Sequence, residues 1–180
     1  MRIRVAIVAT VIAASIGLAA PSVNAAHERM VSPAWFEGEL IDLSHDWGKA
    51  TACNVSAEES RCFRTEAEMD DDIAQRQRTV QDRGVIVASL STCASSLKLY
   101  NGTSYTGTVL NLSTRFSYIN LSTYGFDNLA SSYKVGACDV DMFAGAGGAG
   151  CLYPGDTSAN SHAVAMSSGW NNVVSSVYIY

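Results

Sequence analysis

The chain has 180 residues and a formal net charge of −5, with 48% hydrophobic and 16% charged residues. This length accommodates one ordinary domain and a small additional segment, which excludes a large multidomain assembly. The apolar content excludes a largely disordered chain. The acidic balance, without any basic patch, argues against a nucleic-acid partner and against binding to an anionic membrane.

Residues 1–25 are typical of a secretory signal peptide. Arg2 and Arg4 precede an apolar run over 5–18, and residues 23–25 supply the small side chains that a signal peptidase requires. The run is too short for a membrane-spanning helix. We therefore expect cleavage after Ala25 and a secreted, extracellular protein.

An acidic segment with a hairpin and one helix is expected over 26–90. Residues 27–84 hold 13 of the 17 acidic side chains of the chain. Thr65 followed by Glu68 forms a capping box, which predicts a helix from residue 66 to about residue 79. The acidic residues of its first turns suit the positive end of the helix dipole and a solvated face better than a metal site.

Export places the five cysteines in an oxidising compartment, where disulfides persist. Cys53 and Cys62 are nine residues apart across a turn-rich stretch, which predicts a stapled hairpin. Cys93 and Cys138 precede and follow a series of expected strands, so antiparallel pairing of those strands would bring the two together. A bond between Cys138 and Cys151 is the alternative that the spacing leaves open.

The sequence from residue 85 onward is typical of a β-sheet protein. Short runs rich in β-branched and aromatic residues alternate with turns rich in Gly, Asn, Ser and Thr. These runs cover 85–87, 97–100, 109–112 and 116–119. We expect a mainly β domain over 91–180.

One stretch of eight residues occurs twice, 44 residues apart. The copies are Gly125–Ser132 and Gly169–Ser176, and each has a glycine, an aromatic residue, two Asx residues, two spacers and two serines. Such self-similarity predicts two structural units of the same kind. A single copy would equally suit a turn without an ion, because Asx and Ser side chains cap nearby backbone groups.

Two patterns carry a resemblance to a known family. Tyr100, Tyr105 and Gly107 fit the aromatic and glycine spacing of the first hairpin of a βγ-crystallin Greek key. The stretches 127–132 and 171–176 fit the two-Asx, two-spacer, Ser/Thr-Ser signature of microbial calcium-binding βγ-crystallins. Over about 97–180 the chain therefore resembles a βγ-crystallin-type domain.

The resemblance implies two Greek-key motifs packed as a β-sandwich, here preceded by a small disulfide-stapled segment with one short helix. In the second motif Tyr153 matches the first aromatic position, but Ser158 and Asn160 stand where the second aromatic residue and the glycine belong. We therefore expect a degenerate first hairpin in that motif.

The resemblance also implies two calcium ions, each bound crosswise by the two stretches. One site would use the side chain of Asp127 or Asn128, the carbonyl of Leu129, the hydroxyl of Ser175 and the carbonyl of Asn101. The other would use Asn171 or Asn172, the carbonyl of Val173, the hydroxyl of Ser131 and the carbonyl of Pro154. Among these side chains only Asp127 is charged, so we expect modest, micromolar to millimolar affinity.

The export signal, the stapled N-terminal segment and the run Cys151–Tyr153 also resemble secreted bacterial proteins of peptidase inhibitor family I36. The calcium-binding signature implies a secreted calcium-binding protein with a structural or interaction role. The likeness to family I36 implies the alternative, an inhibitor whose partner is an extracellular metalloprotease. We expect a monomer and no enzyme, because the sequence lacks a nucleophile elbow, a phosphate-binding loop and paired carboxylates in the β region.

Overall fold

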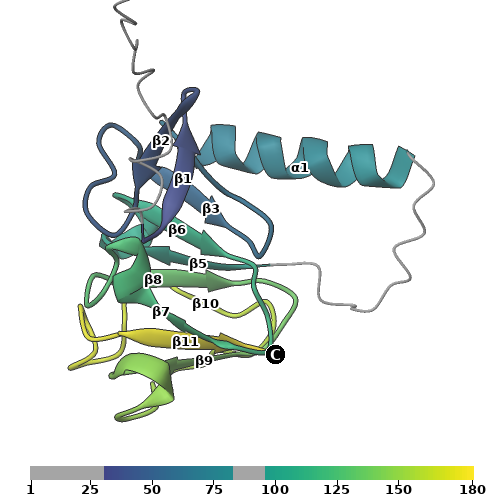
Figure 1. Cartoon of the computed structure of the whole chain (residues 1–180). Helices are drawn as coiled ribbons and strands as arrows, with labels where there is room; N and C mark the ends of the chain where they lie inside the picture. Colours follow the sequence, from purple (N-terminus) through teal and green to yellow (C-terminus); the bar gives the residue numbers. More distant parts are fainter. Residues whose placement is uncertain (1–30, 83–95) are drawn as a thin grey trace, which may run out of the picture.

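The structure is a computed structural model that describes residues 31–82 and 96–180. Its regular structure is mainly β, with one α-helix (Figure 1), as expected. The elements are β1 (Pro33–Phe36), β2 (Glu39–Asp42), β3 (Ala52–Val55), β4 (Ser60–Phe63), α1 (Glu66–Asp82), β5 (Leu97–Tyr100), β6 (Val109–Leu112), β7 (Tyr118–Asn120), β8 (Ser132–Val135), β9 (Val140–Phe143), β10 (His162–Ala163) and β11 (Ser176–Ile179).

Two Greek-key motifs form the C-terminal part of the molecule. In the first motif, β5 pairs antiparallel with both β6 and β8. In the second motif, β9 pairs antiparallel with β11, and an isolated bridge between Phe143 and Leu152 marks the second strand. The third strand of each motif is exchanged: β7 pairs with β11, and β10 pairs with β8. The two motifs are therefore interlocked.

The core lies between the two sheets. Alternate residues of β5, β6 and β8 face alternate residues of β9 and β11, as the period of two along a strand requires. The buried apolar side chains on the two sides include Leu97, Leu99, Leu110, Leu112, Tyr133, Val140, Met142, Val177 and Ile179. The fold class expected from the sequence, a sandwich of two Greek keys, is confirmed by this strand pairing.

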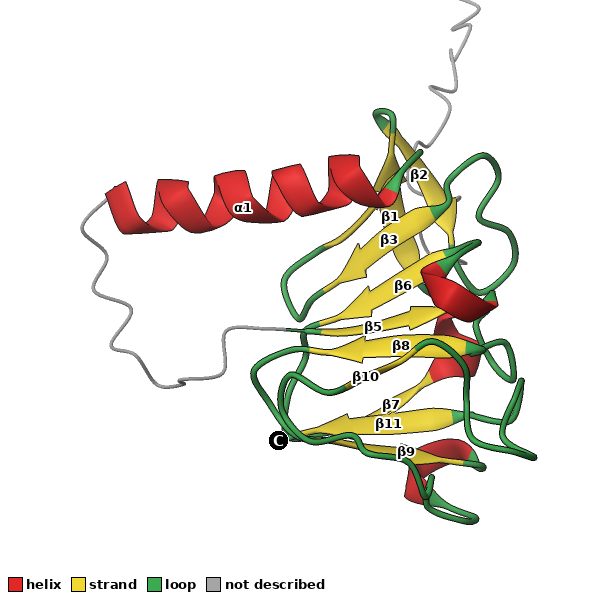
Figure 2. Ribbon diagram, turned by 180° about the vertical axis from the view of Figure 1, so that it is seen from behind, coloured by secondary structure: helices red, strands yellow, loops and turns green. Residues whose placement is uncertain are grey.

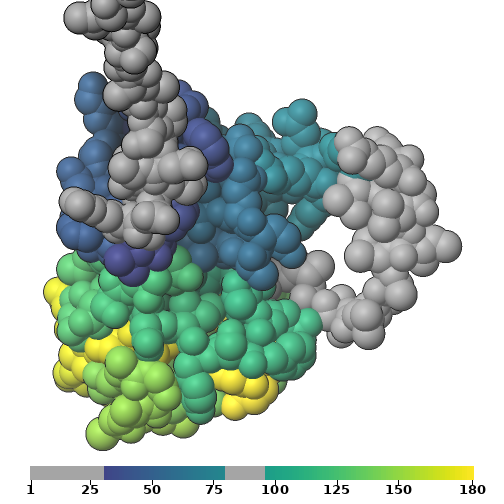
Figure 3. Space-filling view, viewed as in Figure 1, coloured from purple at the N-terminus to yellow at the C-terminus, as the bar shows by residue number. Residues whose placement is uncertain are grey.

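The N-terminal segment extends the first sheet instead of forming a separate unit. Strand β3 pairs in parallel with β6, and the sheet order is β10-β8-β5-β6-β3-β4-β1-β2. Figure 2 shows this continuous run of strands, and in the space-filling view the atoms of the N-terminal strands lie directly on those of the Greek-key part (Figure 3). Ala34, Leu43 and Val55 belong to the same buried cluster as the sandwich core.

Helix α1 begins as the capping box predicts but ends later. The Glu68 amide donates to Thr65 Oγ1 at 3.2 Å, and Glu68 Oε2 accepts from the Arg64 amide at 3.0 Å. The helix continues to Asp82, about one turn beyond the predicted end. Figure 1 shows its C-terminal half projecting away from the strands. Among the described residues, no helix has the length and apolar character needed to cross a membrane.

The acidic residues of α1 are more than a solvated face. Lys98 Nζ donates to Glu66 Oε1 and to Asp70 Oδ1, both at 2.7 Å, and the Tyr100 hydroxyl donates to Glu66 Oε1 at 2.7 Å. Partial burial by itself would raise the pKa of Glu66, but the hydrogen bonds from Lys98 and Tyr100 outweigh it and lower that pKa. The helix is thus tied to the outer face of the sheet, where Met69 is fully buried.

The structure contains the predicted disulfide between Cys53 and Cys62 and excludes the alternative bond between Cys138 and Cys151. Cys53 and Cys62 are directly opposite each other in the β3–β4 hairpin and form a disulfide. Cys151 is a free, exposed cysteine and Cys138 is disulfide-bonded, so the Cys138–Cys151 alternative is wrong. Cys93 lies outside the described residues, as do the expected signal peptide and the expected strand at 85–87.

The strand predictions for 97–100 and 109–112 coincide with β5 and β6, whereas the run 116–119 is displaced. Phe116 has a φ of 58° and is exposed, so it belongs to the turn that precedes β7. Strand β7 therefore begins two residues later, at Tyr118.

Candidate functional site

The two copies of the repeated stretch have the same backbone conformation. Each precedes the last strand of its motif, β8 or β11. The second Asx residue of each copy is left-handed, with φ of 55° at Asn128 and 58° at Asn172. Asn is the residue type, after glycine, that best tolerates this conformation. The structure therefore explains why the second Asx position holds Asn in both copies.

The copies cross each other and are joined by matching hydrogen bonds. The Asn128 amide donates to the Val174 carbonyl at 3.0 Å, and the Asn172 amide donates to the Ala130 carbonyl at 3.0 Å. Each left-handed Asn is thus held by the backbone of the other motif. The geometry follows from the exchanged third strands, which bring the starts of β8 and β11 together.

Side-chain oxygens of the two copies meet in two places. Ser131 Oγ donates to Asn172 Oδ1 at 3.1 Å, and Ser175 Oγ donates to Asn128 Oδ1 at 3.3 Å. These are the crosswise pairs that the resemblance implies, each with an amide oxygen from one motif and a hydroxyl from the other. Two oxygens that each lie about 2.4 Å from one calcium ion are themselves about 3 Å apart, so the donor set fits this ion.

Four further expected ligands lie on the same two stretches, and most are open to solvent. Asp127 and Asn171 are exposed, Leu129 is 39% exposed, and Val173 is half-buried. The Asp127 carboxylate accepts a hydrogen bond from Asn128 Nδ2 at 3.1 Å. Among the described residues, no three His, Cys, Asp or Glu side chains gather as a metal site. The candidate sites consist instead of amide, hydroxyl and carbonyl oxygens, with one carboxylate.

Each pair of side-chain oxygens lies beside a different hairpin from the one expected. The Ser131 amide donates to the Tyr100 carbonyl at 2.7 Å, and the Ser175 amide donates to the Phe143 carbonyl at 2.8 Å. Asn101 therefore belongs with the pair Ser131–Asn172, whereas the sequence analysis placed its carbonyl with Ser175 and Asp127. In the structure each serine is hydrogen-bonded to the first hairpin of its own motif.

The expected carbonyl of Pro154 also has to be corrected. In the first hairpin the Asn101 amide donates to the Thr108 carbonyl at 3.1 Å, and in the second the Ala144 amide donates to the Cys151 carbonyl at 3.0 Å. Ala144 thus occupies the position equivalent to Asn101. Pro154 lies after this hairpin and after the bridging residue Leu152.

The second hairpin is regular in its backbone, although its aromatic pattern is incomplete. The Gly102 amide donates to the Thr106 carbonyl and the Gly145 amide to the Ala149 carbonyl, at 3.0 and 2.9 Å. Gly148 occupies the position of Tyr105. The sequence analysis placed this hairpin at Tyr153, Ser158 and Asn160, which was wrong. Tyr153 is instead a core residue whose ring lies 5.3 Å from that of Trp170, centroid to centroid.

The last serine of each copy holds the hairpin and was not predicted to have this role. Ser132 Oγ donates to the Gly102 carbonyl at 2.6 Å and accepts from the Tyr105 amide at 3.1 Å. Ser176 Oγ makes the same two contacts, with Gly145 and Gly148, at 2.6 and 2.9 Å. Both serines are completely buried. The repeat contained the signal, since both copies end in two serines, but only the folded hairpin shows the partner.

No family model matches the chain, and no curated protein matches it in sequence. Several solved structures are similar to about half of it. A βγ-crystallin from Ciona intestinalis is 20% identical, over 48% of this chain and 100% of that chain, with a TM-score of 0.41. A βγ-crystallin domain from Clostridium beijerinckii is 21% identical, over 48% and 98%, with a TM-score of 0.40. One from Flavobacterium johnsoniae is 21% identical, over 47% and 92%, with a TM-score of 0.40.

Proposed function

We propose that the protein is a secreted calcium-binding protein with a structural or interaction role. The observation that carries the proposal is the pair of crossed oxygen contacts, Ser131 with Asn172 and Ser175 with Asn128. Each contact joins the two motifs, so an ion bound there would hold them together. Calcium prefers oxygen ligands of these kinds.

The two sites would differ in affinity. The Asp127 site comprises Asp127, Asn128, the Leu129 carbonyl and Ser175, next to the hairpin that begins at Ala144. The Asn171 site comprises Asn171, Asn172, the Val173 carbonyl and Ser131, next to the hairpin that begins at Asn101. Only the Asp127 site contains a carboxylate. It should therefore bind calcium more tightly, because affinity for a hard cation rises with the charge of its ligands.

Thermal unfolding with calcium and with a chelator tests the proposal. An ion that binds only the folded state stabilises it by about 2.7 kcal/mol at a concentration one hundred times the Kd. For a chain of this size the midpoint of unfolding should rise by about 5 to 10 °C. The double variant Ser131→Ala, Ser175→Ala should lose the shift. An unchanged midpoint of the wild-type protein at millimolar calcium would contradict the proposal.

Inhibition of an extracellular metalloprotease is the alternative implied by the resemblance to family I36, and its support comes from the sequence. Titration of the protein into a thermolysin-like protease assay tests it. Inhibition at stoichiometric protein would support this function, and full protease activity across a small panel of metalloproteases would contradict it.

A further inference from the structure

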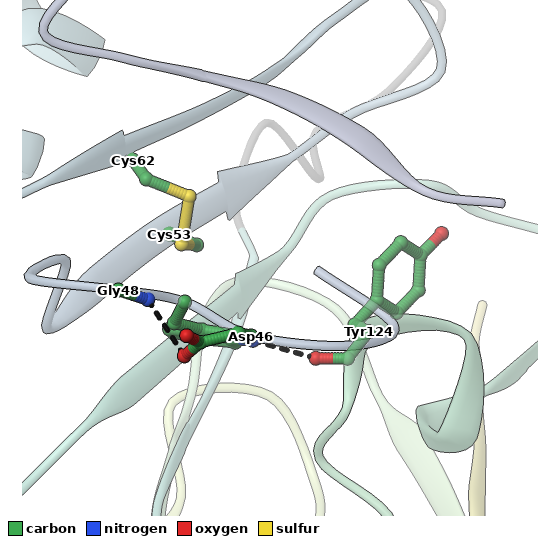
Figure 4. Close-up of a disulfide and its surroundings, with 6 residues drawn as sticks. Asp46, Gly48, Cys53, Cys62 and Tyr124 are labelled. Carbon is green, nitrogen blue, oxygen red and sulfur yellow. Dashed lines mark hydrogen bonds between the residues drawn. A yellow bond between two sulfur atoms is a disulfide. The ribbon is translucent and has the colours of Figure 1, made fainter. Parts of the chain in front are cut away.

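The N-terminal segment contacts one of the two repeated stretches directly. The Trp47 indole N–H donates to the Tyr124 carbonyl at 2.8 Å (Figure 4). Tyr124 is the last residue of a short 3₁₀ turn that leads into Gly125 and the first copy. The contact joins residues 77 positions apart in the chain. It therefore depends on the N-terminal strands having joined the sheet.

Packing around this hydrogen bond is close. The rings of Trp47 and Phe126 lie 5.9 Å apart, centroid to centroid, and Phe126 is only 1% exposed. Gly125 is left-handed, and a Cβ atom there would lie 2.5 Å from the Leu43 carbonyl oxygen. Only glycine therefore fits at position 125, because the left-handed backbone disfavours any other residue and the Leu43 carbonyl leaves no room for a Cβ atom.

The loop that carries Trp47 is held in place by hydrogen bonds of its own. The Gly48 amide donates to Asp46 Oδ1 at 2.9 Å, and the Ala50 amide donates to the Trp47 carbonyl at 3.0 Å. Strand β3 begins two residues later, where it pairs with β6 and carries Cys53 of the disulfide. Figure 4 shows Asp46 and Gly48 together with this disulfide. The loop that carries Trp47 therefore leads into a strand that is held by sheet pairing and by a disulfide.

Within residues 31–82 and 96–180, no such hydrogen bond joins the second copy to the N-terminal segment. A Cβ atom at Gly169 would meet no atom within 4 Å. The aromatic residue of this copy, Trp170, packs on Tyr153 of its own motif. The two stretches are alike in sequence and backbone, yet only the first is packed against Trp47.

We propose that Trp47 is a positioning residue for the Asp127 site, an inference that rests on the proposed calcium binding. Trp47 acts through Tyr124 and Phe126, which fix the approach of the chain to Asp127 and Asn128. Holding this loop in its binding conformation raises affinity by lowering the entropy lost when calcium binds. The coupling is reciprocal, so calcium at this site holds the N-terminal segment more firmly in turn.

Calcium titration calorimetry of the full-length mature protein tests the proposal one site at a time. The Ser131→Ala variant retains the Asp127 site, and the Ser175→Ala variant retains the Asn171 site. Trp47→Phe keeps an aromatic ring against Phe126 but removes the indole hydrogen bond. In the Ser131→Ala background it should raise the calcium Kd about three- to tenfold, as expected for one lost hydrogen bond. In the Ser175→Ala background the Kd should stay within twofold.

Trp170→Phe is the control, because it makes the same Trp-to-Phe change at the aromatic position of the other stretch, the position that Phe126 holds in the first. In the Ser131→Ala background it should leave the Kd within twofold. If Trp47→Phe leaves the Asp127 site unchanged, or weakens both sites equally, the positioning role is wrong and calcium binding stands. If the wild-type protein binds no calcium, the proposed function fails and this inference fails with it.

If the Trp47→Phe variant folds poorly, hydrogen exchange tests the proposal in proteins that keep Trp47. The indole N–H proton of Trp47 is followed by NMR hydrogen exchange in the Ser131→Ala and Ser175→Ala proteins. Calcium should slow this exchange at least threefold in Ser131→Ala and leave it unchanged in Ser175→Ala. Equal exchange with and without calcium in the Ser131→Ala protein would overturn the proposal.

Discussion

Ser131 and Ser132 are adjacent in the chain but contact different partners. Ser131 Oγ reaches Asn172 of the other motif, whereas Ser132 Oγ is hydrogen-bonded inside the hairpin of its own motif. The same division holds for Ser175 and Ser176. In each pair the first hydroxyl joins the two motifs, and the second is bonded within the hairpin of its own motif.

Alanine substitutions should separate these two roles. Ser132→Ala leaves the partly buried Gly102 carbonyl and Tyr105 amide without this partner, so it should lower the free energy of unfolding by about 1–3 kcal/mol in calcium-free buffer. Ser131→Ala should lower it less and should instead reduce the stabilisation by calcium. Urea unfolding with and without calcium measures both quantities. Equal destabilisation by the two variants in chelator would contradict the division.

Among the described carboxylates, Asp42 is the one whose pKa is lowered furthest. Partial burial would raise its pKa, but hydrogen bonds from the Ser44 hydroxyl and from the amides of Val31, Ser44 and Ser32 outweigh this and lower the pKa to about 2. A carboxylate with a depressed folded-state pKa stabilises the fold above its unfolded pKa of about 3.9, and this stabilisation is lost as the pH falls toward 2.

Acid unfolding should therefore depend on Asp42. Between pH 5 and pH 2, Asp42→Asn should show a smaller loss of stability than the wild-type protein, because it cannot take up the proton. Urea midpoints measured across this range test the prediction. The exposed Asp71→Asn is the matched control and should follow the wild-type pH dependence. If Asp42→Asn and the wild-type protein show the same pH dependence, protonation of Asp42 does not cause the loss of stability in acid.

At the scale of elements, the two hairpins achieve the same backbone with different side chains. In the first, the Tyr100 and Tyr105 rings pack edge to face with centroids 5.6 Å apart. In the second, Gly148 replaces the tyrosine, and Tyr118 of β7 packs on Phe143 at 5.8 Å. A Cβ atom at Gly148 would overlap the Tyr118 ring. The exchanged strand thus supplies the aromatic ring that the second hairpin lacks.

Because the Tyr118 ring takes the place of a side chain at Gly148, the effects on stability of substitutions at these two positions should not be additive. Gly148→Tyr should destabilise the protein by more than 2 kcal/mol, because the new side chain overlaps Tyr118. In the Tyr118→Ala background the same change should cost less, since the overlap is removed and Tyr105 shows that tyrosine tolerates this backbone, with a φ of 60°. A double-mutant cycle of urea unfolding measures the coupling. Additive effects would contradict this account.

At the scale of the molecule, the N-terminal strands cover an edge that the Greek keys leave open. Strand β6 has β5 on one side and β3 on the other. Without β3, its backbone amide and carbonyl groups would be unpaired along one side, and such edges promote association between chains. The N-terminal segment therefore completes the first sheet as well as contacting the first repeated stretch.

Removal of the N-terminal segment should expose this edge. A chain that begins at Ser91 should be less stable than the full mature protein and should self-associate, as measured by urea unfolding and by size-exclusion chromatography with light scattering. In the shortened chain Asn111→Lys should reduce the association, because a charge on an edge strand disfavours pairing. A shortened chain that stays monomeric and equally stable would show that β3 is dispensable.

Much of the architecture could be predicted because its signals are local or repeated. The runs at 97–100 and 109–112 form strands, Thr65 and Glu68 cap a helix, and Cys53 pairs with Cys62. The repeat predicted two structural units of the same kind. The second hairpin was misplaced for a physical reason: Gly148 carries no aromatic ring, and its replacement, Tyr118, comes from another strand and has no sequence pattern to reveal it.

By itself the sequence determined the β character, the staple and the duplicated Asx and Ser stretches, since these depend on residue type and spacing. The crossing of the two stretches was an implication of the family resemblance. Tertiary structure alone decided which hairpin accompanies each serine, that β3 continues the sheet beside β6, and that Trp47 packs on only one copy. Parallel pairing and contacts between residues 77 positions apart depend on how distant segments pack, and no local periodicity encodes that choice.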